Sequence, residues 1–409
     1  MSQPPAVPTG PSNPPAPWPA LDYETQIWAG GGVTASGPEA TKASARGARY
    51  KSAVPPFIAH LTPQLPRHIE ELAQEAEAEL QEFDSDHGEK MRTFAPILLR
   101  SEAAASSQIE NLTASARQIF TAELGLTGKR NASEIVANTR SMESAIQLSG
   151  DLSAQSISTM HRVLMDGQPR HTPGIFRDEA VWIGTSASSP VGAIFVAPDH
   201  TRVPALIDDL STFAQRYDMA ALVQVAVTHA QFETIHPFSD GNGRTGRALA
   251  QAMLRRRRLT RNVAVPVSAG LLVDIDSYHR ALTQYREGEV LPIVESFALA
   301  ALRAVPNGRR LVADIEEAGE KWIATVKPRA RSAKQRLMTF ALRQPVFTAE
   351  VAASAIGVSL PNMYRDLHDL VEAGFLAAKA EHRGPTVWRQ QDVLNAIDAF
   401  AVRAGRRQP

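Results

Sequence analysis

Apolar residues recur every three or four positions along most of this chain, the spacing that places them on one face of an α-helix. Between Arg67 and Phe83 the apolar positions are Ile69, Leu72, Ala76 and Leu80, and glutamates occupy the solvent face. The same pattern predicts helices at about 94–112, 132–148, 152–165, 203–217, 219–235 and 243–258. The fold class expected is therefore mainly α, an all-helical body.

The helical spacing of apolar residues stops between Gly167 and His200. Two β-favouring runs, 180–183 and 193–196, are separated by a stretch rich in Gly, Ser and Pro. This arrangement predicts a β-hairpin with a long loop. Taken alone, it is as well explained by an ordinary surface hairpin.

Composition also divides the chain into segments. Residues 1–46 are rich in Pro, Gly and Ala, which predicts disorder, and N-terminal helices are expected over 47–130. The main helical domain is expected over 131–305, followed by a polar helical connector over 306–343 and a small domain over 344–409.

The last segment has a distinct order of elements. From Phe347 to Arg389 the sequence predicts helix, turn, helix, strand, wing and strand, with turn glycines at 357 and 374. This order resembles a winged helix-turn-helix. The second helix carries Arg365 but also several acidic residues, which would repel phosphates. DNA binding and contact with a protein partner therefore remain equally open for this segment.

Overall charge and composition exclude several classes of protein. Among 409 residues there are 43 basic and 43 acidic side chains, so no bulk field favours nucleic acid or an anionic membrane. The chain has no cysteine, which rules out disulfide bonds and thiolate metal sites. The N-terminus does not read as a secretory signal, and no long apolar run is free of charges. We expect a cytoplasmic protein that does not enter the membrane.

The stretch from His236 to Arg247 concentrates residues with chemical potential. His236 has an ordinary pKa near neutrality and can move protons at working pH. Asp240 offers the hard oxygen ligand that Mg²⁺ prefers. Gly241-Asn242-Gly243 can bring backbone N–H groups close to an anion.

Two arginines complete this stretch. Arg244 and Arg247 lie three residues apart, so a helix that begins near Gly243 presents both on one face. A helix N-terminus beside two guanidinium groups favours a polyphosphate. Each feature alone is commonly structural, a helix-end histidine or a turn. Their combination within twelve residues predicts a centre for phosphoryl or nucleotidyl transfer.

The same residues carry a resemblance to a known family. His-Pro-Phe-x-Asp-Gly-Asn-Gly-Arg-x-x-Arg, matched at each defined position from His236 to Arg247, is the signature of Fic-domain proteins. Most Fic proteins transfer AMP from ATP, with Mg²⁺, onto a hydroxyl of a target protein. The resemblance implies that His236 is the catalytic base and Asp240 the metal ligand. It assigns these residues to the nucleotide and its phosphates: Phe238, Gly241, Asn242, Gly243, Arg244, Arg247 and, as a lining residue, Tyr278.

Upstream, Ser106, Glu110 and Asn111 match the pattern of the inhibitory helix found before some Fic domains, predicted here at about 96–112. The resemblance implies that Glu110 pairs with Arg247 and blocks the γ-phosphate position. An ordinary solvent-facing glutamate is the alternative. Some inhibited relatives also remove AMP.

The hairpin resembles the flap that holds the modified segment of the target through main-chain pairing. Its matching residues are Val181, Trp182, Ile183, Ile194, Phe195 and Val196.

Three functional interpretations follow. The first is a protein adenylyltransferase whose partners are target proteins with a modifiable Ser, Thr or Tyr; self-modification and a homodimer are compatible with it. The second is a DNA-binding transcriptional regulator that uses the winged helix, with the Fic domain as sensor or relic. The third, a di-iron oxidase, is disfavoured because the spacing Glu233-x-x-His236 occurs only once.

Overall fold

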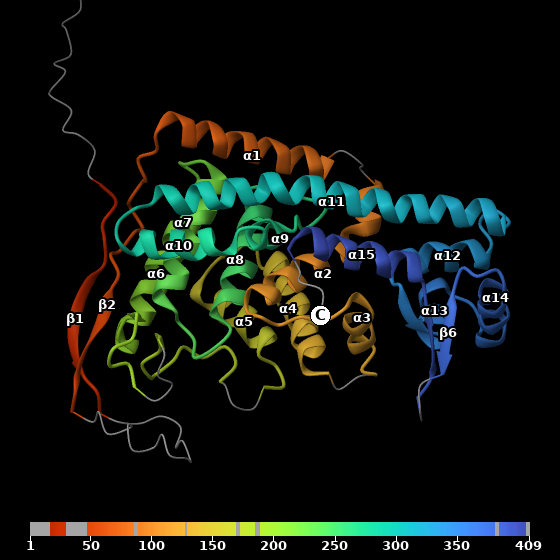
Figure 1. Ribbon diagram of the computed structural model, residues 1–409, viewed down its shortest axis with the longest axis horizontal. Helices are drawn as coiled ribbons and strands as arrows, with labels where there is room; N and C mark the ends of the chain where they lie inside the picture. Colours follow the sequence, from red (N-terminus) through yellow and green to blue (C-terminus); the bar gives the residue numbers. More distant parts are fainter. Residues whose placement is uncertain are drawn as a thin grey trace, which may run out of the picture.

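The computed structural model describes residues 17–29, 47–85, 89–126, 129–168, 172–184, 189–380 and 384–405. It is mainly helical, as predicted from the apolar periodicity (Figure 1). The first helices are α1 (Arg67–Ser85), α2 (Glu89–Ile109), α3 (Ala116–Glu123), α4 (Arg130–Gln147), α5 (Ala154–Leu164) and α6 (Val203–Ala214). They are followed by α7 (Ala221–Ile235), α8 (Asn242–Arg256), α9 (Val267–Leu272), α10 (Ile275–Arg286) and α11 (Leu291–Val326). The last are α12 (Ala333–Arg343), α13 (Ala349–Ile356), α14 (Leu360–Glu372) and α15 (Gln391–Arg403), and a 3₁₀ turn, η2, spans His200–Arg202.

Helix α7 is the centre of the body. All fifteen of its residues are buried, because neighbouring helices cover it on every side. Its first turns are mainly apolar, as a core helix requires, and the polar residues of its C-terminal half are buried as well. α8 follows α7 directly and packs against it, α4 and α5. These two helices carry the signature between them.

Two long helices run over one side of this core. Figure 1 shows α1 and α11 side by side along the long axis, above α7, α8 and α9. Gly308 of α11 allows the close approach, since a Cβ there would lie 2.9 Å from the ring of Phe83 in α1. No helix in the described part of the chain combines the length and apolarity needed to cross a bilayer.

Three small antiparallel sheets complete the fold. β1 (Asp22–Ile27) pairs with β2 (Arg49–Val54), and Asp22 lies opposite Val54. β3 (Trp182–Ile183) pairs with β4 (Phe195–Val196), which is the predicted hairpin; residues 185–188 of its loop lie outside the described residues. In the C-terminal sheet β7 (Thr386–Arg389) lies between β5 (Val346–Thr348) and β6 (Ala377–Ala380).

The predicted disorder over residues 1–46 is wrong for residues 17–29, and the rest of that range lies outside the described residues. β1 falls inside it, and Trp18 packs on Tyr285 with ring centroids 6.0 Å apart. The backbone N–H of Leu21 also donates to the carbonyl of Arg286, 2.9 Å away. These aromatic and backbone contacts with α10 outweigh the local Pro and Gly content.

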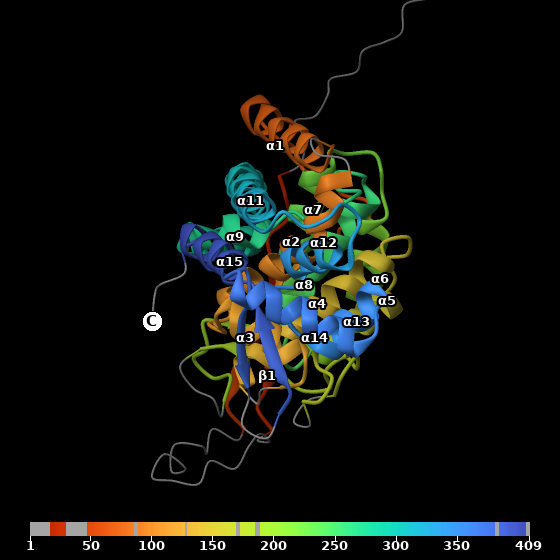
Figure 2. The ribbon, with the colours of Figure 1, turned by 90° about the vertical axis from the view of Figure 1, so that its right-hand side faces the viewer.

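The predicted connector and C-terminal boundary also need correction. α11 runs without interruption from Leu291 through residue 306, and its residues Leu311 and Ile315 lie in the main core. Polar residues on one face of α11 had suggested a solvent-exposed linker. Helix α15 likewise joins the main core through Ile397 and Phe400, whereas α12–α14 enclose a separate, smaller core. Figure 2 shows α15 beside α9 and α11, away from α13 and α14.

Candidate active site

His236 terminates α7. Its backbone is left-handed, with φ of 50°, and Pro237 follows, so the helix cannot continue. The Nδ1 atom lies 3.3 Å from the carbonyl oxygen of Glu233. In the tautomer that donates Nδ1–H to this carbonyl, Nε2 carries the free lone pair. The side chain remains 28% exposed, which leaves it within reach of a substrate.

The environment of His236 favours the neutral imidazole. Burial lowers the pKa of His236 to about 4, and the charges of Arg177 and Arg286 act in the same direction. A neutral imidazole at physiological pH can accept a proton. The geometry therefore suits a general base, and the low pKa keeps the imidazole free to accept a proton while making it a weaker base than an ordinary histidine.

Two residues outside the signature hold its loop. Arg177 is buried and donates Nε–H to the carbonyl of His236 at 2.8 Å and Nη2–H to that of Pro198 at 2.7 Å. His161 accepts the N–H of Gly174 through Nδ1, so its Nε2 carries the proton, 3.1 Å from the carbonyl oxygen of Asp240. The sequence offered a signal for Arg177, in the run Pro-Gly-x-x-Arg before the hairpin, but none for His161.

The side chains of Phe238 and Asn242 are buried within the loop. Phe238 is fully buried and stacks on His161 at 3.7 Å. Asn242 accepts the N–H of Phe238 at 2.9 Å and donates to its carbonyl at 2.8 Å. In this structure these side chains close and anchor the loop, and their assignment to the nucleotide, made from the family resemblance, stays a prediction.

The loop ends at the N-terminus of α8. Gly241, with φ of 74°, precedes the helix in a left-handed conformation that glycine adopts without strain. The unpaired N–H groups of the first turn and the positive end of the helix dipole favour an anion. Arg244 and Arg247 both lie on this helix, as predicted, and both are buried. Arg244 faces Glu134 of α4, with Nη1 and Oε2 3.4 Å apart.

Glu110 lies on this anion-binding turn. Its Oε1 accepts Nη2–H of Arg247 at 2.7 Å, and a Cβ at residue 243 would overlap the same oxygen. Only a glycine at 243 leaves room for the carboxylate. Partial burial acts to raise the pKa of Glu110, but the charge and hydrogen bond of Arg247, together with the charges of Arg244 and His236, hold the pKa below its ordinary value. The carboxylate is therefore charged at neutral pH.

The predicted inhibitory residues share this contact. Ser106 accepts Nε–H of Arg247 through Oγ and Nη2–H through its carbonyl, both at 2.9 Å. Asn111 has φ of 61°, the left-handed conformation that asparagine tolerates better than most residues, and it follows the end of α2. The structure thus brings Ser106, Glu110 and Arg247 together. Asn111 lies in the turn that follows Glu110 and makes no contact in this group.

A buried polar cluster lies behind Arg247. Tyr278 is 2% exposed, and its hydroxyl lies 2.6 Å from Nε2 of His229. Tyr278 is therefore part of the core in this structure, and its assignment to the nucleotide pocket stays a prediction. Burial raises the pKa of Glu233 to about 7. This carboxyl lies 3.9 Å from Nδ1 of His236.

Asp240 presents its carboxylate at the surface of the loop. It is exposed, and Oδ1 accepts the N–H of Gly241 at 2.7 Å. No group of three or more His, Asp or Glu side chains suited to a metal occurs among the described residues, so a di-iron centre finds no support there. A single carboxylate fits Mg²⁺, which keeps most of its shell for water and substrate phosphates.

The hairpin residues divide into two groups. Phe195 and Val196 are buried, and Arg286 lies over the ring of Phe195 at 3.8 Å. Ile183 and Ile194 are 48% and 83% exposed. Side-chain contact with a target can therefore come from the second pair, whereas Val181 and Trp182 are half-buried.

Fold and site together define a helical domain with a histidine-bearing loop over an anion-binding helix N-terminus. A model of the Fic/DOC family matches residues 151–254, which include this loop and most of α8. This part of the chain is a Fic/DOC-type domain.

Two curated proteins and one solved structure are similar to this chain. Protein adenylyltransferase fic-1 of Caenorhabditis briggsae is 27% identical over 148 residues, which are 36% of this chain and 27% of that protein. A probable protein adenylyltransferase of Aquifex aeolicus is 34% identical over 103 residues, 25% of this chain and 30% of the relative. The matched stretches thus span less than one third of the length of each of these two relatives. A Fic family protein from Desulfovibrio desulfuricans G20 shares the fold, with a TM-score of 0.51 and 22% identity, over 80% of this chain and 97% of that one.

Proposed function

We propose that this protein is an adenylyltransferase that moves AMP from ATP to a hydroxyl of a target protein and that Glu110 keeps it inactive. The observation that carries the proposal is the carboxylate of Glu110 on Arg247, at the turn that would otherwise hold a phosphate. The names of the relatives support the same reaction.

The mechanism assigns a task to each exposed part of the loop. His236 takes the proton from the target hydroxyl as its oxygen attacks the α-phosphorus. A new bond forms between the hydroxyl oxygen and the α-phosphorus. The bond between the α-phosphorus and the oxygen that bridges it to the β-phosphate breaks, and pyrophosphate leaves. The first turn of α8 and Arg247 orient the phosphates. Mg²⁺, held by Asp240 and the phosphates, would supply charge neutralisation on the nucleotide.

Inhibition follows from the geometry of the ion pair. Arg247 is 3% exposed, so its guanidinium cannot turn to a new partner in solvent while Glu110 holds it. The carboxylate also repels the γ-phosphate. ATP would then bind with its α-phosphorus displaced from the line of attack, and a displacement of about 1 Å can lower the rate roughly 10²-fold.

The test compares transfer of label from α-labelled ATP to proteins by the wild type and by Glu110→Gly at equal folded concentration. We expect at least a roughly 10²-fold higher rate for the variant, including self-modification. Glu110→Ala should behave similarly, which separates the loss of the carboxylate from the flexibility of glycine. The double variant Glu110→Gly/His236→Ala should show no label. Equal rates for wild type and Glu110→Gly would reject the inhibition, and absence of transfer in both would reject the reaction.

A further inference from the structure

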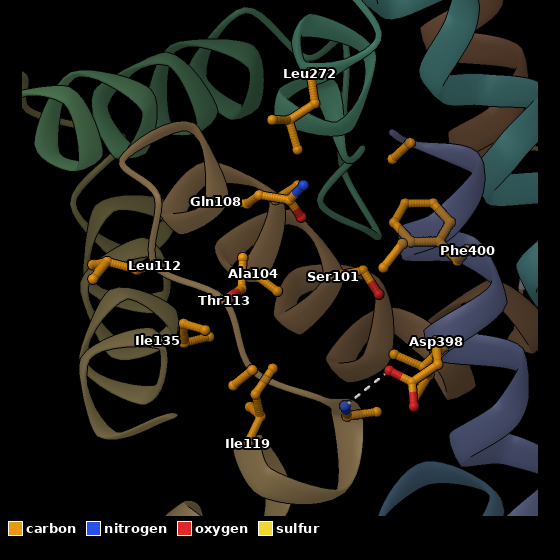
Figure 3. A pocket seen from close by; sticks show the side chains of 16 residues that line it. Ser101, Ala104, Gln108, Leu112, Thr113, Ile119, Ile135, Leu272, Asp398 and Phe400 are labelled. Atoms are coloured by element: carbon orange, nitrogen blue, oxygen red, sulfur yellow. Dashed lines mark hydrogen bonds between the residues drawn. The ribbon is translucent and has the colours of Figure 1, made fainter. Parts of the chain in front are cut away.

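Two buried polar groups without a hydrogen-bond partner differ in what can reach them. The hydroxyl of Ser101 borders the space between α2, α3 and α15 (Figure 3), whose cavity volume of about 30 Å³ has room for a water or two. Water alone can satisfy that group. Nε of Arg286 also lacks a partner within the described residues, but this guanidinium lies close enough to His236 to lower its pKa. A substrate at the candidate base can therefore approach Arg286.

Arg286 is the last residue of α10 and lies beside the β3–β4 hairpin. Its Cζ atom is 3.8 Å from the centre of the ring of Phe195 in β4. A guanidinium that stacks on an aromatic ring keeps its N–H groups in its own plane, where they can still donate hydrogen bonds. The edge of Arg286 thus remains available to a planar acceptor such as a carboxylate.

The charge of Arg286 has no full counterpart. No acidic side chain in the described part of the chain forms an ion pair with it. Glu233 is the acid whose charge acts on Arg286, yet burial raises the pKa of Glu233 to about 7, so close to half of this carboxyl is neutral at that pH. Burial also lowers the pKa of Arg286. A cation that has lost water without gaining a full partner favours an anionic ligand.

The position of Arg286 favours an anion of the target over the end of the triphosphate. The groups that act on the pKa of Arg286 include Tyr23 of β1, whereas Glu110 and Arg247, which mark the γ-phosphate position, are not among them. Tyr23 is 56% exposed. Arg286 therefore lies toward β1 and the β3–β4 hairpin, on the side of His236 where the target segment would bind.

The expected shape of the target segment restricts where its acidic residue lies. Main-chain pairing with the hairpin would hold the segment as an extended strand. Successive side chains of a strand point to opposite faces, so the residues two positions before and after the modified hydroxyl share its face. With the hydroxyl at His236, a carboxylate two positions away would reach Arg286.

We propose that Arg286 selects target segments in which an aspartate or glutamate lies two residues from the modified Ser, Thr or Tyr. The guanidinium binds this carboxylate and so holds the neighbouring hydroxyl against Nε2 of His236. The carboxylate itself is unchanged by the reaction. This inference rests on the proposed adenylyl transfer and names the class of its protein substrates.

The first experiment locates the modified residues. The full-length Glu110→Gly variant is incubated with ATP and a soluble cell lysate, and residues that carry AMP are identified by mass spectrometry. We expect Asp or Glu two residues from a modified hydroxyl several-fold more often than around unmodified hydroxyls of the same proteins. Modified sites without this enrichment would overturn the selectivity and leave the transfer in place. The absence of any modified site would reject the proposed function, and the selectivity with it.

The second experiment measures the effect on rate. Synthetic peptides copy the most heavily modified site, one with the acidic residue and one with its amide, Asn or Gln, in the same place. Glu110→Gly should use the acidic peptide with a kcat/KM about 10-fold higher or more, the effect of one hydrogen bond to a charged group. Glu110→Gly/Arg286→Gln should use the two peptides alike. Because the ratio is measured within one variant, any change in the pKa of His236 cancels.

Two further variants in the Glu110→Gly background serve as controls. Arg280 is an exposed arginine of the same helix that donates to Ser277, so Arg280→Gln should keep the preference for the acidic peptide. Arg286→Lys keeps the charge without the planar fork and should show a smaller preference than the parent. It replaces Arg286→Gln if thermal unfolding shows that the latter is not folded. A preference unchanged in the Arg286 variants, or a raised KM for ATP with an unchanged peptide ratio, would overturn the proposal.

Discussion

His236 combines a fixed position with an unusual proton affinity. Its backbone conformation ends α7, Arg177 holds its carbonyl, and the carbonyl of Glu233 lies near Nδ1. Removing a positioned general base costs roughly 10²–10⁴-fold in rate. We therefore expect His236→Ala, in a Glu110→Gly background, to lose transfer to this extent while ATP still binds. Measured rates equal to those of the parent would show that another group acts as the base.

The pH dependence of transfer provides a second test of this residue. Because burial lowers the pKa of His236 to about 4, the imidazole is neutral across the range from pH 6 to 8. The base should therefore be fully available there, and kcat/KM of Glu110→Gly should be flat once Glu233, whose pKa of about 7 falls in the same window, is replaced by Gln. An exposed histidine with a pKa of about 6.5 would lose about three quarters of its neutral form between pH 8 and pH 6. A fall of that size in kcat/KM, with no matching loss of stability of the variant between pH 8 and pH 6, would contradict the lowered pKa of His236.

At the scale of elements, the end of α2 decides where Glu110 lies. Asn111 adopts a left-handed conformation with φ of 61°, and the chain turns away from the helix there. Asn111→Gly should keep this turn. Asn111→Val should destabilise it by about 1–2 kcal/mol, because a β-branched residue meets steric strain in that conformation.

A weakened turn loosens Glu110 from Arg247, so labelling should rise in Asn111→Val and stay low in Asn111→Gly. The comparison uses labelled ATP with both variants at equal folded concentration. If both variants label alike, the end of α2 has no part in positioning the carboxylate.

At the scale of the whole molecule, α15 makes the C-terminal part and the Fic body interdependent. Phe400 is 1% exposed and lies in the main core, whereas Val402, two residues later, is 40% exposed. Phe400→Ala should lower the free energy of unfolding by about 3–5 kcal/mol. Val402→Ala should change it by about 0.5 kcal/mol or less.

Chemical denaturation of the full chain measures both effects. A small cost for Phe400→Ala would indicate that α15 can detach, and would support the independent C-terminal domain that the sequence suggested. The packing predicts instead that removal of residues 347–409 destabilises the Fic body, since Leu394, Ile397 and Phe400 would leave its core.

The sequence by itself determined where the main helices lie and which residues offer catalytic or binding groups at the candidate site. Apolar periodicity located α1, α4, α7 and α8 to within a few residues, because burial of a helical stripe is a local property of the sequence. The contiguous run from His236 to Arg247 contains the histidine proposed as the base, the carboxylate proposed for Mg²⁺ and the two arginines. Its length made the family resemblance specific.

Only the tertiary structure decided which of these residues are buried and which are exposed in the site. Phe238, Asn242 and Tyr278 are buried because distant elements cover them, and His161 reaches Asp240 across 79 positions of sequence. Likewise, β1 and α15 are held by α10 and the main core. Local composition could not predict these outcomes, since contacts between segments far apart in sequence override local preference.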